Sequence, residues 1–380
     1  MTKKGRDVEL VSAQFAEHSG IGIVEYGVRL AKALRQQNSG LNFYFVPLMK
    51  SNIYNIPAGF YDTSLHTQRA AEPDIIHYLD PGFITKDLLR GVWRKKRAKL
   101  VVTIHDLHVA DFLFAIAKTT KTYILKRPFF VLTSPFATPV EKIVTRYVVK
   151  KADMIICVSE NTRDRVVEKY RINPKKCKVI YPIIDGAFKP SRKGHGNKKT
   201  VIGHFSSYLP NKNVEVLIRA FKKTSNKNLE LHLYGSGMPF KIDDDKRIKY
   251  YGFILTEKIP SVLNSFDVFV FPSLWEGFGM PVMEAKRCKV PVITYAGAEL
   301  PRIVKQNTLQ FKDEDDLANM IRMSAWKKLD TKKAYSDIKK CKEDYVAKRI
   351  IRTYESLLVA DKNLGRNAVH GRAKQSAFKF

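Results

Sequence analysis

The chain has 380 residues, enough for two domains of ordinary size, and its 44% apolar content is that of a globular protein with buried cores. Its formal net charge of +30 is spread over both halves and favours an anionic partner such as a nucleotide, nucleic acid or acidic lipid, although solubility alone would also explain it. The four cysteines are isolated from one another in the sequence, which argues against a disulfide scaffold. No apolar run reaches about 18 residues, which argues against a helix that spans a membrane.

The first half alternates apolar strands with amphipathic helices. Strands are predicted over 8–13, 43–46, 75–79, 100–104, 154–158 and 178–181, and helices over 22–37, 140–151 and 160–170. Val- and Ile-rich strands that alternate with helices indicate a parallel sheet covered on both faces.

A glycine loop, HSGIG at 18–22, follows the first strand and opens the first helix. Glycines there let backbone N–H groups approach a phosphate at the positive end of the helix. Gly20 and Gly22 do not complete a GxGxxG pattern, because position 25 is Glu. A tight turn without a ligand explains this loop equally well.

His105 follows the strand at 100–104, in the segment IHD. A histidine at the carboxyl end of a parallel strand is placed to hydrogen-bond a substrate hydroxyl. A partly buried histidine that bonds to the backbone is the competing interpretation.

The alternation stops at 186–199, GAFKPSRKGHGNKK, which we interpret as a linker between domains. It then restarts, with strands predicted over 200–205, 229–234, 248–252, 268–271 and 290–294, and helices over 212–224, 256–265, 281–287, 313–328 and 331–360. The polar, basic tail at 361–380 is expected to be mobile.

The sequence therefore predicts an α/β protein with two Rossmann-like doubly wound domains in tandem, facing each other across a cleft. We expect an N-terminal domain at 1–187, a linker at 188–199, a C-terminal domain at 200–345, and a helix and basic tail at 346–380 that pack back on the first domain. Ligands of such sheets bind outside the carboxyl ends of the strands.

Two polar loops lie at such ends in the second half. Lys212 is expected at the start of a helix, where a cation is unfavourable unless an anion is nearby, so it is a candidate for binding phosphate. Gly235 and Gly237, in YGSG, permit close approach of the backbone to a base or ribose. An exposed lysine and an ordinary turn are the alternatives.

The stretch WEGFGMPVMEA at 275–285 follows the predicted strand 268–271. Glu276 is expected in the loop, and Glu284 in the first turn of a helix that begins near Pro281. Gly277 and Gly279 free the backbone N–H groups between them to converge on an anion or on hydroxyls. Glu284 could equally be a favourable charge near a helix N-terminus.

Together, the segments SGIG, IHD, ADMIICVSE, LPNKNVEVLIRAF, LYGSG and FVFPSLWEGFGMP resemble the GT-B retaining glycosyltransferases of the E-x7-E family, the glycosyl transferases group 1 or family 4. The resemblance implies a nucleotide-diphosphate sugar donor, UDP- or GDP-linked, with no cofactor and no metal. It assigns the donor sugar to Glu276 and to residues Gly277, Phe278, Gly279 and Met280, the diphosphate to Lys212, Gly20 and Gly22, the base or ribose to Gly235 and Gly237, the ribose to Glu284, and a catalytic contact with the sugar to His105.

This chain departs from the family in two places. Ser207 stands where the family has an arginine five residues before the lysine, and Arg302 stands where the family often has a glutamate after proline. One cation for the diphosphate is thus missing or supplied from elsewhere.

The acceptor side of such a fold is the first domain, which here carries two basic segments beside aromatic and aliphatic residues. Their candidate contacts with an acceptor or membrane are Arg94, Lys95, Lys96, Arg97, Lys121, Lys126 and Arg127. They suit an anionic membrane surface, and hence a lipid-linked or surface glycan acceptor, although a solvated helix face explains them as well.

The sequence leaves three alternative functions: modification of nucleic acid by the same chemistry, noncatalytic binding of sugar or nucleic acid, and sugar phosphorolysis. No base-reading motif is recognised, and 380 residues are few for a phosphorylase. The isolated cysteines, with Cys157 inside an apolar run, and the polar N-terminus MTKKGRDVEL favour a cytoplasmic protein without a secretory leader, peripheral at most on the inner face of a membrane.

Overall fold

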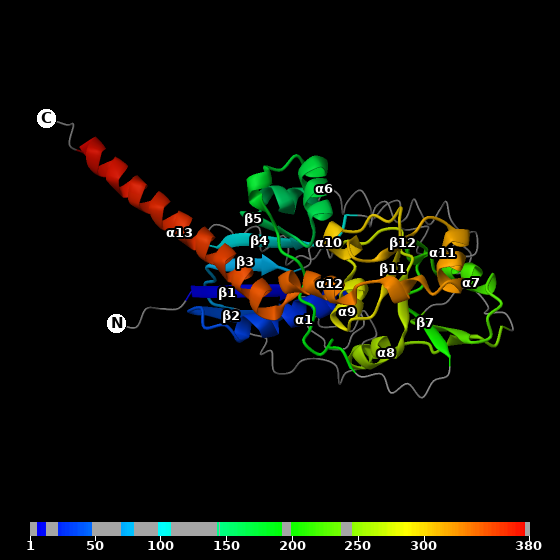
Figure 1. The fold of residues 1–380 in the computed structure, drawn as a ribbon. Coiled ribbons are helices and arrows are strands. Elements are labelled where there is room, and N and C mark those ends of the chain that lie inside the picture. Colours follow the sequence, from blue (N-terminus) through cyan, green and yellow to red (C-terminus); the bar gives the residue numbers. More distant parts are fainter. Residues whose placement is uncertain are drawn as a thin grey trace, which may run out of the picture.

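The computed structural model describes residues 6–12, 22–47, 70–79, 98–107, 143, 145–191, 199–236 and 245–376, with side chains described as far as 359. Within them the chain forms two six-stranded sheets in which every strand pair is parallel. Figure 1 shows the two sheets in separate halves, each flanked by helices. The predicted class, two doubly wound α/β units, is confirmed.

The first sheet has the order β2-β1-β3-β4-β5-β6. Its strands are β1 (Arg6–Ser12), β2 (Leu41–Pro47), β3 (Ile75–Tyr78), β4 (Lys99–Ile104), β5 (Met154–Cys157) and β6 (Cys177–Val179), and helices α1 (Gly22–Arg35) and α6 (Glu160–Tyr170) flank it. Val8 and Leu10 of β1 enter one core cluster, whereas Val11 enters another. This alternation buries both faces of the sheet, as parallel sheets require.

The second sheet has the order β12-β11-β10-β7-β8-β9. Its strands are β7 (Thr200–Phe205), β8 (Leu229–Tyr234), β9 (Ile248–Tyr250), β10 (Val268–Phe271), β11 (Val292–Tyr295) and β12 (Leu309–Phe311). The helices are α7 (Val214–Lys222), α8 (Ile259–Ser265), α9 (Met280–Arg287), α10 (Arg302–Lys305) and α11 (Glu314–Arg322). The strand order reverses between β7 and β10, so the crevice outside their carboxyl ends is the expected ligand site.

Several predicted helices are shorter than expected. The predicted helix 212–224 begins only at Val214, and Lys212 lies in the preceding 3-10 turn, Pro210–Lys212, so its placement at a helix start was wrong. Asn213, whose backbone is left-handed with φ 50°, separates this 3-10 turn from α7. The predicted helix 331–360 is divided into α12 (Thr331–Ser336), a 3-10 turn and α13 (Glu343–Ser376).

The last helix, α13, returns to the first sheet. Val346, Ile350 and Tyr354 lie in the same core cluster as residues of β1 and α1, and the Tyr354 hydroxyl lies 2.6 Å from Nδ1 of His77 in β3. In Figure 1 the red end of α13 extends beyond the first sheet. Because α13 continues to Ser376, most of the basic tail predicted from 361 belongs to this helix, and its mobility stays a prediction.

The four cysteines are free and buried, which for Cys157 agrees with its place inside an apolar run. No helix in the described part of the chain is both long and apolar enough to cross a membrane.

Candidate active site

The crevice between β7 and β10 holds an ion pair made by two of the predicted residues. Lys212 follows β7 and Glu276 follows β10, and Lys212 Nζ lies 2.6 Å from Glu276 Oε1. The side chain of each residue is 16% exposed, so both remain partly accessible to solvent. The amide nitrogen of Leu274 donates to the carbonyl of Asn211 at 2.8 Å and holds the two loops together.

The glycine turn after Glu276 forms the start of α9. Gly279 has φ 101° and caps the helix, with Pro281 in its first turn as predicted. Among the described residues, no hydrogen bond uses the backbone N–H groups of Gly277, Phe278 or Gly279. These donors lie at the positive end of a helix and are therefore suited to an anion or to hydroxyl oxygens.

The side chains of the turn have different surroundings. Phe278 is buried, with its ring 5.5 Å from that of Tyr181, and Met280 packs partly against the same core cluster. Either residue could therefore contact a ligand mainly through its backbone.

His105 lies across the interface from this turn, at the carboxyl end of β4. Its Nε2 lies 2.8 Å from the carbonyl of Leu79, which can only accept, so Nε2 carries the ring proton. The imidazole packs nearly perpendicular to the ring of Tyr26 from α1, with the ring centroids 4.6 Å apart. A Cβ added to Gly277 would lie 2.0 Å from the carbonyl oxygen of His105, so the two halves of the chain are in direct backbone contact here.

Glu284 occupies the second turn of α9, not the first, because the helix already begins at Met280. Only 4% of Glu284 is exposed, and its Oε1 accepts a hydrogen bond of 3.1 Å from Arg29 of α1. Burial raises the pKa of Glu284, and the Arg29 charge opposes that rise. The explanation of Glu284 as a mere helix-end charge does not fit a buried pair between domains.

Gly235 follows β8 and packs closely against the carboxyl ends of β7 and β9. It has φ 135°, and a Cβ there would lie 1.7 Å from the carbonyl oxygen of Ser206. The Tyr250 hydroxyl donates to the Gly235 carbonyl at 2.6 Å. Close packing of β7, β8 and β9 therefore accounts for this glycine without a ligand, although the same edge borders the crevice.

The two departures from the family pattern lie on the surface. Ser207 and Arg302 are exposed, and no described contact joins Arg302 to Lys212 or Glu276. Arg165 of α6 instead reaches the second half and forms an ion pair with Glu299. A small pocket there is lined by Asp106, Leu107, Asn161, Thr162, Arg165, Glu276, Gly277 and Glu299.

Sequence reasoning missed Arg29, Tyr26 and Arg165, because each acts on a partner distant in sequence. Gly22 is the first residue of α1. Several predicted residues lie outside the described residues: Gly20, Gly237, Arg94, Lys95, Lys96, Arg97, Lys121, Lys126 and Arg127. Within the described ranges, no group of three or more His, Cys, Asp or Glu side chains could hold a metal ion.

Comparison with known proteins gives two kinds of match. The curated phosphatidylinositol N-acetylglucosaminyltransferase GPI3 subunit of Saccharomyces cerevisiae is 25% identical over 244 residues, 57% of this chain and 54% of the relative. A D-inositol 3-phosphate glycosyltransferase of Mycobacterium is 24% identical over 186 residues, 44% of this chain and 42% of the relative. This chain thus spans about half the length of the curated relatives it matches.

Solved structures match over nearly the whole chain. HepE of Anabaena, in complex with UDP and glucose, has a TM-score of 0.66 and 17% identity, covering 92% of this chain and 99% of its own. Sucrose-phosphate synthase from Thermosynechococcus elongatus has a TM-score of 0.66 and 17% identity, covering 93% and 100%. A model for glycosyltransferase family 4 matches residues 3–188, and one for glycosyl transferases group 1 matches residues 199–324. The protein therefore has the GT-B fold and belongs to the group 1 glycosyltransferases.

Proposed function

We propose that the chain is a retaining, metal-independent hexosyltransferase that moves a sugar from a nucleotide diphosphate to an acceptor hydroxyl. The observation that carries the proposal is the pair of Lys212 and Glu276 in the crevice between β7 and β10, beside three backbone N–H groups without a described partner. A cation, a carboxylate and backbone donors are the groups that a sugar diphosphate requires.

Each group has a separate task in this proposal. Lys212 Nζ and the N–H groups of 277–279 bind the diphosphate and stabilise the charge that develops on it as it leaves. Glu276 accepts hydrogen bonds from the donor sugar, and Glu284 accepts them from the ribose. The imidazole of His105 contacts the sugar from the other domain.

The proposed reaction uses these groups as follows. As the anomeric C–O bond breaks, its electron pair passes to the diphosphate, which Lys212 neutralises in place of a metal. The acceptor hydroxyl attacks from the same face and gives its proton to the departing phosphate oxygen. Configuration at the anomeric carbon is then retained, without a second carboxylate acting as nucleophile.

The proposed donor is a UDP- or GDP-linked hexose. The Anabaena structure holds UDP and glucose, which makes UDP-glucose the first compound to test. A thermal-shift panel of nucleotide-diphosphate sugars should include at least one that raises the unfolding midpoint, because a ligand that binds only the folded state stabilises it. If neither UDP nor GDP sugars move the midpoint of the folded protein, the donor site is wrongly placed.

The proposed acceptor is a lipid-linked or surface glycan at the cytoplasmic face of a membrane. Two matched relatives carry phosphatidylinositol or inositol phosphate in their names, and the chain has a formal net charge of +30. Co-sedimentation should show stronger binding to vesicles with acidic lipids than to neutral ones, and the difference should shrink with added salt. Equal binding to both kinds of vesicle would contradict the membrane assignment.

A further inference from the structure

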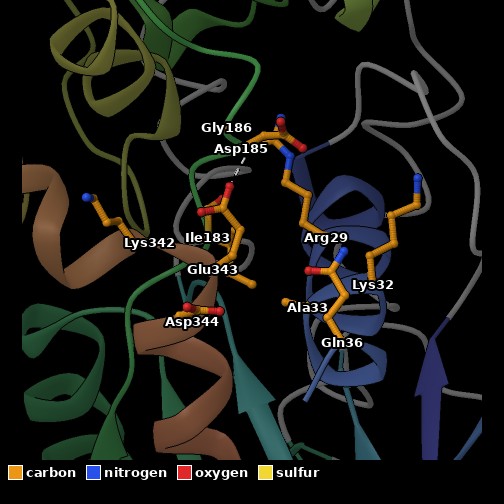
Figure 2. Close-up of a pocket in the computed structure, with 10 residues that line it drawn as sticks. All are labelled: Arg29, Lys32, Ala33, Gln36, Ile183, Asp185, Gly186, Lys342, Glu343 and Asp344. Atoms are coloured by element: carbon orange, nitrogen blue, oxygen red, sulfur yellow. Dashed lines mark hydrogen bonds between the residues drawn. The ribbon is translucent and has the colours of Figure 1, made fainter. Parts of the chain in front are cut away.

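Arg29 connects both halves of the chain to the segment between them. It lies on α1 and is 8% exposed, and its Nη1 donates to Glu284 of α9 at 3.1 Å and to the carbonyl of Ile183 at 3.4 Å. Its guanidinium lies over the ring of Phe188, 5.6 Å from the centroid. Figure 2 shows Arg29 extending from α1 toward residues 183–186.

The charge balance around the carboxyl group of Glu284 depends on Arg29. Burial raises the pKa of Glu284, Arg29 lowers it, and Glu25 of α1 and Asp185 of the connecting segment raise it again. Cys288, the residue that follows α9, is a further titratable neighbour: burial and the Glu284 charge raise the pKa of its thiol, and Arg287 of α9 lowers it. Arg29 is the cation that lowers the pKa of this carboxyl group, so its loss would leave a buried negative charge uncompensated or force the carboxyl group to take up a proton.

The geometry also leaves part of Glu284 available. Oε1 accepts from Arg29, and no other hydrogen bond to Glu284 is made by the described residues. A carboxylate has two oxygens with about four acceptor sites. Anchoring one oxygen fixes the direction of the other, which is the arrangement needed to accept from two neighbouring hydroxyls.

We infer that Arg29 is a positioning residue for the donor, holding Glu284 from the opposite domain so that its Oε2 receives the ribose hydroxyls. This inference rests on the proposed function. It assigns to α1 a part in nucleotide binding that the E-x7-E motif does not contain. The ribose-binding carboxylate is then complete only when the two domains have this arrangement.

The test is a mutant cycle on donor affinity. Calorimetry would give the Kd of UDP-glucose, or of the best donor from the thermal-shift panel, for wild type, R29Q, R29K, E284Q and R29Q/E284Q between about pH 5.5 and 8.5. R29Q should weaken binding roughly tenfold at neutral pH and move the loss of affinity on acidification to higher pH, and R29K should recover most of the affinity. Lys32→Gln, which removes a cation from the same pocket, is the matched control and should leave the Kd unchanged.

The cycle separates the possible outcomes. If Arg29 acts through Glu284, adding R29Q to E284Q should change the Kd less than twofold. The comparison of E284Q with R29Q/E284Q, which both lack the Glu284 charge, tests the inference even if R29Q alone does not fold. An equal loss from R29Q with and without Glu284, or an unchanged Kd and pH profile in R29Q, would overturn the inference. Absence of donor binding in the wild type would instead refute the proposed function.

Discussion

At the scale of single residues, Lys212 and Glu276 form an ion pair with each other in the crevice when no donor is bound. Lys212 Nζ and Glu276 Oε1 lie 2.6 Å apart, and their opposite charges compensate each other. An incoming diphosphate must share Lys212 with Glu276, while the carboxylate turns to the sugar. The pair therefore links binding of the phosphate to recognition of the sugar.

The variant E276Q should separate these two effects. Removing the carboxylate charge relieves its repulsion of the diphosphate and releases Lys212, so UDP alone should bind roughly threefold to tenfold more tightly. Sugar transfer should fall by about a hundredfold, because a contact to the reacting sugar is lost. Calorimetry with UDP and a nucleotide-release assay would measure both, with circular dichroism as the check of folding. Weaker UDP binding together with wild-type transfer would contradict the assignment.

Some residues of the candidate site could be predicted from the sequence and others could not. Glu276, Gly277 and Gly279 were found because a local pattern after a buried strand places them at the edge of the sheet. Arg29 is 255 positions from Glu284, and Arg165 is 134 positions from Glu299. No local periodicity records such pairs, since they depend on how the two domains meet.

At the scale of elements, His204 joins the two strands that frame the crevice. It lies on β7, fully buried, with Nδ1 2.8 Å from the carbonyl of Val270 on β10 and Nε2 2.8 Å from the Ser206 hydroxyl. Burial lowers its pKa from 6.5 to about 4. The folded protein therefore holds this imidazole neutral, while the unfolded chain takes up a proton below pH 6.5.

This difference predicts how stability changes with pH. As pH falls from 6.5 toward 4, His204 should lower the free energy of unfolding by up to about 1.4 kcal/mol per pH unit. Buried His77, with a pKa lowered to about 3, adds to the same trend. Asn keeps a hydrogen-bond donor in place of Nδ1. In urea unfolding between pH 7 and 4, the free energy of unfolding of H204N should therefore depend less steeply on pH, by the equivalent of about one proton taken up on unfolding. Identical slopes in both proteins would show that His204 does not titrate on unfolding.

The elements themselves were largely predictable. Strands β7, β8 and β10 have the predicted bounds, because short apolar runs bounded by turn residues are typical of buried strands. The prediction missed β12 and α10, which have three and four residues, too few to show a period. It also merged α12 with α13, because the 3-10 turn between them keeps buried residues such as Ile338 and Cys341.

At the scale of the whole molecule, the contact between the domains depends on a glycine. A Cβ on Gly277 would lie 2.0 Å from the backbone oxygen of His105, and no rotamer change can relieve a backbone clash. G277A should therefore fold but keep the domains about 1 Å or more apart, which lowers transfer by roughly a hundredfold. The control G186A adds a Cβ no closer than 3.4 Å to its neighbours and should behave as wild type. Small-angle scattering and a transfer assay would test this, and wild-type values of both for G277A would contradict it.

The overall fold followed from strand–helix alternation, whereas the relation between the two halves did not. Side chains such as Arg29 and Arg165 connect the two halves. Helix α13 belongs to the end of the chain but packs with the first sheet. Two tandem sheets can be inferred from sequence order, but their facing surfaces arise only in the folded molecule.

The central claim is that the crevice between β7 and β10 binds a nucleotide-diphosphate sugar. A crystal structure with the strongest donor from the thermal-shift panel, or with UDP, is its most direct test. It should place the diphosphate within hydrogen-bond distance of Lys212 Nζ and the N–H groups of 277–279, and the ribose hydroxyls at Glu284 Oε2. A nucleotide bound elsewhere, with the Lys212–Glu276 pair undisturbed, would contradict the claim.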